Sequence, residues 1–334
     1  MIARSISITI LVVAAILAAG CGGSSDHPPV QLVRDVRLPG GTSRFDYQSV
    51  DEQRHRLYIA HLGASEIVVF DLKHESVSRI INGVPGVHGV LAVPRANRLY
   101  AAASSRHELM TFSEAPERLI RHAKAGILPD GIAYDAPDKE TFVSDEVGDW
   151  EAVFDARSGR RRKLILLGGD AGNVQYDPVM RRALVDVGER NNVAVIDPQS
   201  LRVVRSIVLP GCDHDHGLHL DPPRRLAFIT CDLNNKLLVL DLKTMKILQT
   251  QQVGKTPDVL DFDVRRRLLY VASESGVVAV FAETGRHLVK LGQGFVGAHA
   301  HSVAVDPGTG LVYFPLESVG GHPVLRVMRP LPRR

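Results

Sequence analysis

The stretch Leu269-Tyr270-Val271-Ala272 is the clearest copy of a short apolar segment that recurs about every 42 residues, a period typical of repeat architectures. Each copy has the length and the composition of a buried β-strand. The other copies are Leu57-Tyr58-Ile59-Ala60, Leu99-Tyr100-Ala101-Ala102, Phe142-Val143-Ser144, Leu184-Val185-Asp186, Ala227-Phe228-Ile229-Thr230 and Val312-Tyr313-Phe314. A strand that is repeated in this way indicates a modular β fold.

Each copy follows another apolar strand, which ends at a turn residue. These turn residues are Asp51, Pro94, Asp135, Asp177, Asp221, Asp263 and Asp306. Aspartate suits a turn because its side chain accepts hydrogen bonds from the backbone that follows. A third strand comes after each copy, as at Val239-Leu240-Asp241, and a fourth alternates apolar and polar residues, as at 204–209. Four short strands per repeat and no helical stretch predict an all-β, seven-bladed propeller.

The last repeat lacks a fourth strand, and the N-terminal region supplies a match for it. Residues 32–40 (LVRDVRLPG) resemble residues 203–211 (VVRSIVLPG), which form a fourth strand and the joint after it. We therefore expect the N-terminal strand to complete the last blade and close the ring, which leaves no unpaired edge there. The predicted propeller is a single domain that covers residues 32–330.

These repeats resemble those of the YVTN-repeat, YncE-like β-propellers of bacteria over residues 32–329. The resemblance rests on second strands of the Leu269-Tyr270-Val271-Ala272 type. It implies the propeller fold, but no single activity, because this fold hosts many functions.

Composition excludes several classes of function. The 334 residues are 45% hydrophobic and 23% charged, and the net charge of +3 gives no reason to expect nucleic-acid binding. Three cysteines are too few for a four-cysteine zinc site, and without a Cys-x-x-Cys-His motif we expect no c-type haem. The glycine-rich segment 168–172 precedes no helix, so we expect no nucleotide site. A monomer is expected.

The N-terminus reads as a targeting segment. Arg4 precedes an apolar run over residues 6–19, which is too short to span a bilayer comfortably. The run ends in Leu17-Ala18-Ala19-Gly20-Cys21, which resembles a bacterial lipoprotein signal. This implies a signal peptide over residues 1–20, lipidation of Cys21 and a flexible tether over residues 21–31. An ordinary secretory signal is the alternative.

The predicted location is the cell envelope, with the protein anchored to a membrane through Cys21. The family rule that aspartate after the lipidated cysteine retains a lipoprotein in the inner membrane is not met, because Gly22 stands there. We therefore expect a periplasmic lipoprotein of the outer membrane.

Charged residues separate onto the two ends of the predicted channel. The turns between first and second strands are rich in arginine, for example at residues 265–267, so that end should be basic. It either faces anionic lipid or is merely solvated. The joints between blades should form the opposite end, which is rich in histidine and acids. Its candidate ligand-binding residues are Asp46, His88, Asp130, Asn173 and Asp258.

Four histidines at these joints form a candidate metal site. His214 and His216 are two residues apart, so in an extended segment their side chains would point the same way, and His299 and His301 repeat this spacing. Imidazole suits zinc or copper, and carboxylates can complete the coordination. The alternative is that these residues only satisfy backbone groups of the loops.

Cys212 and Cys231 are predicted to form a disulfide. A hairpin that turns near Pro223 would place them nearly opposite each other, and export would permit the bond. The alternative is that Cys212 is a soft metal ligand beside His214.

Three functions fit this sequence. The first is a binding module that holds a metal ion or a small polar ligand, or docks an envelope protein, at the histidine-rich end. The second is a metal-dependent hydrolase or lyase that uses the same ring, similar only in architecture to the lactonase propellers. The third is a scaffold without a small ligand. We favour the module, because no set of acid, base and nucleophile stands out.

Overall fold

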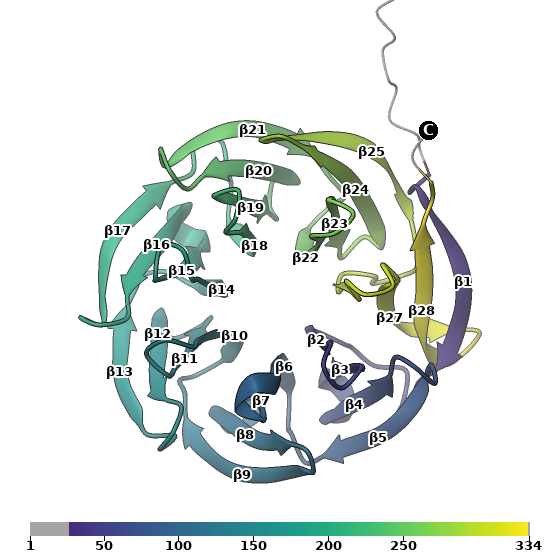
Figure 1. The fold of residues 1–334 in the computed structure, drawn as a ribbon, viewed down its shortest axis with the longest axis horizontal. Coiled ribbons are helices and arrows are strands. Elements are labelled where there is room, and N and C mark those ends of the chain that lie inside the picture. Colours follow the sequence, from purple (N-terminus) through teal and green to yellow (C-terminus); the bar gives the residue numbers. More distant parts are fainter. Residues whose placement is uncertain (1–26, 333–334) are drawn as a thin grey trace, which may run out of the picture.

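The computed structural model describes residues 27–332, whose strands form seven antiparallel sheets of four strands each, arranged as a ring around a central channel (Figure 1). This confirms the predicted seven-bladed propeller. The predicted signal peptide, Cys21 and the first part of the tether lie outside the described residues. Within residues 27–332, no helix has the length and apolarity needed to cross a membrane.

Each blade runs from an inner strand beside the channel to an outer strand on the rim. The inner strands are β2 (Gln48–Asp51), β6 (Val87–Val93), β10 (Pro129–Asp135), β14 (Ala171–Asp177), β18 (Asp215–Asp221), β22 (Pro257–Asp263) and β26 (Ala304–Val305). The second strands are β3 (Arg56–His61), β7 (Arg98–Ala103), β11 (Glu140–Asp145), β15 (Arg182–Val187), β19 (Leu226–Cys231), β23 (Leu268–Ser273) and β27 (Val312–Val319).

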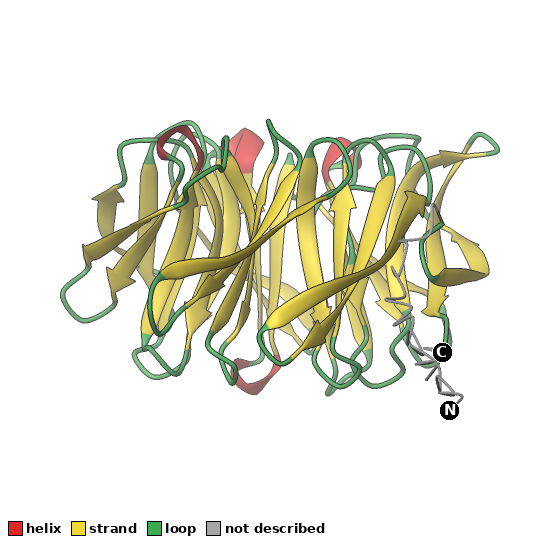
Figure 2. Cartoon of the chain, turned by 90° about the horizontal axis from the view of Figure 1, so that it is seen from above, coloured by secondary structure: helices red, strands yellow, loops and turns green. Residues whose placement is uncertain are grey.

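The third and outer strands complete the blades. The third strands are β4 (Glu66–Asp71), β8 (Glu108–Glu114), β12 (Trp150–Asp155), β16 (Asn192–Asp197), β20 (Lys236–Asp241), β24 (Val277–Thr284) and β28 (His322–Pro330). The outer strands are β5 (Ser76–Asn82), β9 (Glu117–Lys124), β13 (Arg161–Leu166), β17 (Arg202–Val208), β21 (Lys246–Gln252), β25 (His287–Phe295) and β1 (Val30–Arg37). Short 3-10 helices lie on the two flat faces of the disc (Figure 2). They are η1 (Leu62–Ala64), η3 (Ser104–Arg106) and η4 (Gly188–Arg190) between second and third strands, and η2 (Pro94–Ala96) between a first and a second strand.

The core lies between adjacent blades. The second strands β19 and β23 are buried at every position, because each sheet packs against a neighbouring sheet on both faces. Phe228 of one blade contacts Phe262 of the next, with ring centroids 5.5 Å apart. The outer strand β21 instead alternates exposed and half-buried residues, as expected for a strand with one solvated face.

The N-terminal strand closes the ring, as predicted. β1 pairs antiparallel with β28, from Val30 opposite Pro330 to Arg37 opposite Val324 (Figure 1). The two strands are also joined by Arg326, whose guanidinium donates to both carboxylate oxygens of Asp35 at 2.8 and 2.6 Å. Both ends of the described chain are thus held in one sheet.

The aspartates between first and second strands stabilise the turns as expected. Asp51 Oδ1 accepts hydrogen bonds from the backbone N–H groups of Gln53 and Arg54 at 2.8 and 3.0 Å. Each such turn then contains a residue in the left-handed region, for example His55 with φ 54°. The side chains of Asp135, Asp177, Asp263 and Asp306 accept backbone hydrogen bonds in the same way, which explains why the sequence repeats aspartate at this position, whereas the second blade has Pro94 and the 3-10 helix η2 there.

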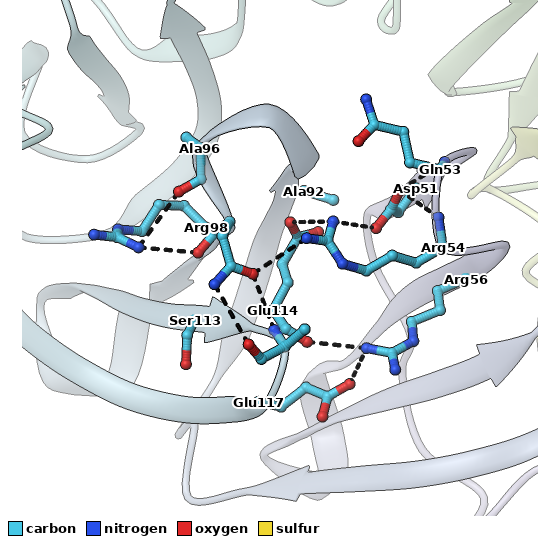
Figure 3. A network of polar contacts seen from close by, with 12 residues as sticks. Asp51, Gln53, Arg54, Arg56, Ala92, Ala96, Arg98, Ser113, Glu114 and Glu117 are labelled. Atoms are coloured by element: carbon cyan, nitrogen blue, oxygen red, sulfur yellow. Dashed lines mark hydrogen bonds and ion pairs between the residues drawn. The ribbon is translucent and has the colours of Figure 1, made fainter.

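The end of the channel that carries these turns, which we call the lower face, is less basic than its arginine content predicts. Arg54 pairs with Asp51 and Glu114, and Arg56 pairs with Glu117 (Figure 3). Further pairs are Arg181–Asp138, Arg182–Asp197, Arg224–Glu283, Arg225–Asp177, Arg265–Glu52, Arg266–Asp263 and Arg267–Glu283. Carboxylates therefore offset much of the positive charge expected from the sequence.

Candidate metal site at the upper mouth of the channel

Most of the candidate ligand-binding residues lie in β-bulges at the beginning of the inner strands. In five blades the pairing of the first two strands shifts there, between Val87/Val90, Pro129/Ile132, Ala171/Val174, Asp215/Leu218 and Pro257/Leu260. A bulge adds one residue and redirects the side chains beside it. The bulges contain His88, Asp130, Asn173, His216 and Asp258. Together with Asp46 and His301 they form what we call the upper mouth.

Glycines let adjacent blades approach closely at the upper mouth. A Cβ atom on Gly89 would lie 2.1 Å from the carbonyl oxygen of Asp130, and one on Gly217 would lie 2.1 Å from that of Asp258. Only glycine fits at such a distance. The close approach brings polar groups of three consecutive blades, on β14, β18 and β22, within reach of one another, and Asn173 Nδ2 donates to the carbonyl oxygen of His216 at 2.8 Å.

Asp258 is the centre of the upper mouth because histidines from both neighbouring blades contact it. Its Oδ2 lies 2.7 Å from His301 Nδ1, and its Oδ1 lies 3.4 Å from His216 Nε2. Burial alone would raise the pKa of this carboxyl, but hydrogen bonds from His216 and His301 lower it far below its usual value. Asp258 is therefore a buried carboxylate anion.

His301 is nearly inaccessible, and its two nitrogens face different kinds of groups. Nε2 lies 3.1 Å from the carbonyl oxygen of Phe45, to which it must donate. Nδ1 faces Asp258 Oδ2 and lies 3.6 Å from Glu274 Oε1. Burial lowers the pKa of His301, but the hydrogen bond and charge of Asp258 outweigh it and raise the pKa. Nδ1 thus holds either a proton or another cation against two carboxylates.

Asp46 and Asp130 form a more acidic half of the upper mouth. Burial raises the pKa of Asp130 well above its usual value, and the nearby charge of Asp46 raises it further. Tyr47 donates its hydroxyl hydrogen to Asp130 Oδ2 at 3.3 Å. Burial also raises the pKa of Asp46, whose Oδ2 lies 4.0 Å from His88 Nε2. His88 Nδ1 lies 2.8 Å from the hydroxyl of Ser104. In this half of the upper mouth, burial thus favours the protonated forms of Asp46 and Asp130.

The structure does not bring the four predicted histidines together. His214 (φ 61°) and His299 (φ 54°) adopt left-handed backbone conformations, so the alternation of an extended strand does not apply to either pair. His299 is largely exposed and lies 3.7 Å from Glu274. His216 and His301 share the partner Asp258, and His299 and His301 both lie near Glu274, but His214 shares no partner with the other three.

His214 belongs to a separate cluster at the joint between the fourth and fifth blades. Its Nε2 lies 2.7 Å from Asp170 Oδ2 and its Nδ1 lies 2.9 Å from Asp232 Oδ1. Hydrogen bonds to Asp170 and Asp232 raise the pKa of His214 to about 10. Both nitrogens are therefore donors at neutral pH, and none is left to bind a metal.

A disulfide joins Cys212 to Cys231, with the two Cα atoms 5.4 Å apart. It links the loop that carries His214 to the end of β19. Cys212 is thus bonded to sulfur in the structure, where it cannot also serve as a thiolate ligand.

Three residues that border the upper mouth, Arg44, Tyr47 and Glu274, are not among the candidate site residues predicted from the sequence. Arg44 and Tyr47 flank Asp46, and Glu274 follows β23. Arg44 donates to Glu274 Oε1 at 2.7 Å. The sequence could have indicated Arg44, because it lies two residues before Asp46, a predicted site residue on the same segment. For Tyr47 there was no such indication, since a tyrosine near a strand is usually part of the core.

One group at the upper mouth has the donor atoms of a metal site. Single ligand atoms of Asp258, Glu274 and His301 all lie within 4.8 Å of one another. Two carboxylate oxygens and one imidazole nitrogen are a donor set that suits divalent transition metals. Beyond the mouth the inner strands enclose a cavity of about 610 Å³, lined in part by Tyr47, Asn173 and His219.

Comparisons with known proteins support the fold. A model of the YNCE-like beta-propeller family matches residues 94–265. No curated protein matches the sequence. A solved chain of the mitotic checkpoint complex is similar with a TM-score of 0.76 and 10% identity, and the match covers 99% of each chain. A chain of Kuenenia stuttgartiensis hydrazine synthase is similar with a TM-score of 0.73 and 15% identity, over 89% of this chain and 97% of that one. At these identities the two likenesses concern the fold alone.

Proposed function

The chain belongs to the family of YncE-like β-propellers, and from this premise we propose that it is an exported, lipid-anchored binding module. In this proposal the upper mouth holds one divalent transition-metal ion, zinc or copper, through Asp258, Glu274 and His301. The ion's remaining position takes water, or a donor group of a small polar ligand or an envelope protein. Binding, rather than catalysis, is the task.

The observation that carries the proposal is the orientation of His301. Its Nε2–H donates to the carbonyl of Phe45, so Nδ1 is the nitrogen that can present a lone pair, and it faces Asp258 and Glu274. Metal-binding histidines are commonly oriented by such a bond from the second nitrogen to a backbone carbonyl. A neutral His301 would place a lone pair against a carboxylate, which is unfavourable unless a cation lies between them.

The spacing of the ligand atoms suits a small ion. Ligand atoms of a tetrahedral zinc site with bonds of about 2.05 Å lie about 3.3 Å apart. His301 Nδ1 lies 2.7 Å from Asp258 and 3.6 Å from Glu274, so shifts of less than an ångström, on the order of side-chain adjustment, would form the site. His216, which lies 3.4 Å from the other oxygen of Asp258, would orient that carboxylate.

Arg44 acts against metal binding. Its guanidinium contacts the oxygen of Glu274 that faces His301. A bound ion would be repelled by this positive charge unless the guanidinium moved away from Glu274. The site therefore resists weakly bound cations and favours one that forms strong bonds to imidazole. This is consistent with zinc or copper, and it disfavours magnesium and calcium, which prefer oxygen ligands.

Metal analysis of the mature protein, purified without a histidine tag, tests the proposal. We expect about one equivalent of zinc or copper, and a melting temperature that rises when zinc is added to metal-stripped protein, as for any ligand of the folded state. His301→Gln should abolish this rise. His74→Gln is the matched control, because His74 also faces an aspartate, Asp71 at 3.0 Å, but on an exposed lower turn. No bound metal and no rise with zinc or copper would refute the site.

Export and lipid anchoring are proposed from Arg4, the apolar run over residues 6–19 and the lipoprotein-like residues 17–21. Cys21→Ser should release the protein from the membrane fraction, and the mass of the mature wild-type chain should show a diacylglyceryl group on Cys21. Recovery of the wild-type chain without lipid in the soluble periplasmic fraction would favour the ordinary secretory signal instead.

A further inference from the structure

A second cavity, of about 750 Å³, lies at the lower face between the second and third blades. Its walls come from the turns after β6 and β10 and from the turn after β12, with Gln53 of the first blade at one side. This volume lies within the range of pockets that bind small molecules. The cavity is far along the channel axis from the upper mouth, and none of its lining residues belongs to that site.

The inner part of this cavity is apolar and aromatic. Leu91 and Val93 line it together with Tyr100 and Tyr134. The two tyrosine rings lie side by side, with centroids 6.2 Å apart and planes inclined by 24°. Such a surface favours a flat or aliphatic group over water.

The rim of the cavity is cationic and, unlike the rest of the lower face, lacks carboxylates. Arg95, Arg98, Lys139 and Arg157 all line the cavity, and no aspartate or glutamate of residues 27–332 does. The difference is visible in Figure 3. There Arg54 and Arg56 point at glutamates, whereas Arg98 donates only to the carbonyl oxygens of Ala96 and Asn97, at 3.4 and 3.0 Å.

The other three cations also form no ion pair with a carboxylate of residues 27–332. Within the described part of the chain, no ion pair joins an acid to Arg95, Lys139 or Arg157. Four positive charges around one apolar cavity repel one another unless an anion is near. Elsewhere on this face the protein itself supplies that anion, for example Glu283 beside Arg267. Here Asp155, whose pKa is lowered by hydrogen bonds from Ser158 and to a smaller extent by the charge of Arg157, forms no ion pair with any of the four cations, so an anion from outside would still be favourable.

We propose that this cavity binds a small organic anion, in which a carboxylate or phosphate group is attached to an apolar, preferably aromatic, body. The anionic group contacts Arg95, Arg98 and Arg157, because guanidinium groups bind carboxylates and phosphates with paired hydrogen bonds. The apolar body lies against the half-buried side chains of Leu91, Val93 and Tyr134. This site is independent of the metal site, and neither requires the other.

Calorimetric titration of the purified protein with three matched probes tests this site. The probes are 1-naphthoate, 1-naphthyl phosphate and the uncharged 1-naphthylmethanol. We expect at least one of the two anions to bind roughly tenfold or more tightly than the uncharged probe, and this preference to shrink at high ionic strength. The comparison of the two anions identifies the anionic group.

Charge reversal locates the binding site. Arg95→Glu should weaken binding of the preferred anion by roughly tenfold or more, with an unchanged melting temperature, because Arg95 is exposed and unpaired. Arg265→Glu is the matched control: Arg265 occupies the corresponding turn of another blade and lines the central channel cavity. Equal binding of all three probes would overturn the proposal. So would loss of binding in Arg265→Glu but not in Arg95→Glu, which would place the anion in the channel.

Discussion

His214 and His301 lie at two joints of the same ring, and each contacts two carboxylates, yet their chemistry differs. Both nitrogens of His214 face carboxylates, Asp170 and Asp232. Only Nδ1 of His301 does, while Nε2 donates to the carbonyl of Phe45. His214 is therefore held as an imidazolium, whereas His301 belongs to the group with Asp258 and Glu274 that could hold a metal ion. The group at the second nitrogen, rather than the number of acids nearby, decides which histidine can be a ligand.

Removal of a ligand gives the largest expected difference between the two clusters. Asp258→Asn should weaken zinc binding by about a thousandfold, or ~4 kcal/mol, because it removes a ligand oxygen and the charge that orients His301. Asp232→Asn, the matched change beside His214, should leave zinc affinity unchanged. Competition with a zinc chelator measures both. Equal losses in the two variants would show that the clusters do not differ as described.

Loss of the disulfide should destabilise the protein without affecting the metal site. Cys212 and Cys231 are separated by 19 positions, and closing a loop of this size contributes about 3 kcal/mol to the free energy of unfolding. The double variant Cys212→Ala/Cys231→Ala should unfold at correspondingly lower denaturant concentration. Its zinc affinity should match that of the wild type. A large drop in affinity would mean that the loop of His214 supports the metal site after all.

The charge of His214 should make stability depend on pH in the alkaline range. Because the pKa of His214 is raised to about 10, its ion pairs stabilise the folded state fully below the unfolded value of about 6.5. This stabilisation is lost as the pH rises through about 10. We expect about 1–2 kcal/mol, since the cluster is partly exposed and screened by solvent. His214→Gln should remove this component from denaturant unfolding measured between about pH 6 and about pH 10.5, which bracket the two pKa values. An unchanged pH profile in His214→Gln would contradict the assignment.

Substitution of Arg44 should have the smallest effect, and it should increase zinc affinity rather than reduce it. Arg44→Gln removes a positive charge that contacts Glu274, so zinc should bind more tightly, by roughly tenfold. A surface control is Arg265→Gln, whose partner Glu52 lies on the lower face. Weaker zinc binding in Arg44→Gln would indicate that Arg44 holds Glu274 in place rather than competing with the ion.

The sequence predicted the fold well because the blade is repeated. Each copy of the second strand and each turn aspartate indicates the same local structure. An unclear strand or turn in one blade can therefore be assigned from the matching positions of the other blades. The missing last strand and the match at residues 32–40 also predicted the pairing of β1 with β28, which the sheet order confirms.

The site was less predictable, because its side chains lie where the repeat is irregular. The joints place His216, Asp258 and His301 at one end of the channel, as position in the repeat predicts. Which of them touch depends on bulges and on left-handed residues such as His214 and His299, which a rule based on strand alternation does not describe. Nor does the sequence say which nitrogen of His301 faces a carbonyl.

The most direct test of the metal site is a crystal of the protein grown with zinc and measured at the zinc absorption edge. The structure predicts one strong anomalous peak within bonding distance of His301 Nδ1, Asp258 and Glu274, with none at His214. A peak between His214 and its two aspartates, or no peak at the upper mouth, would contradict the assignment of His301 as the metal-binding histidine.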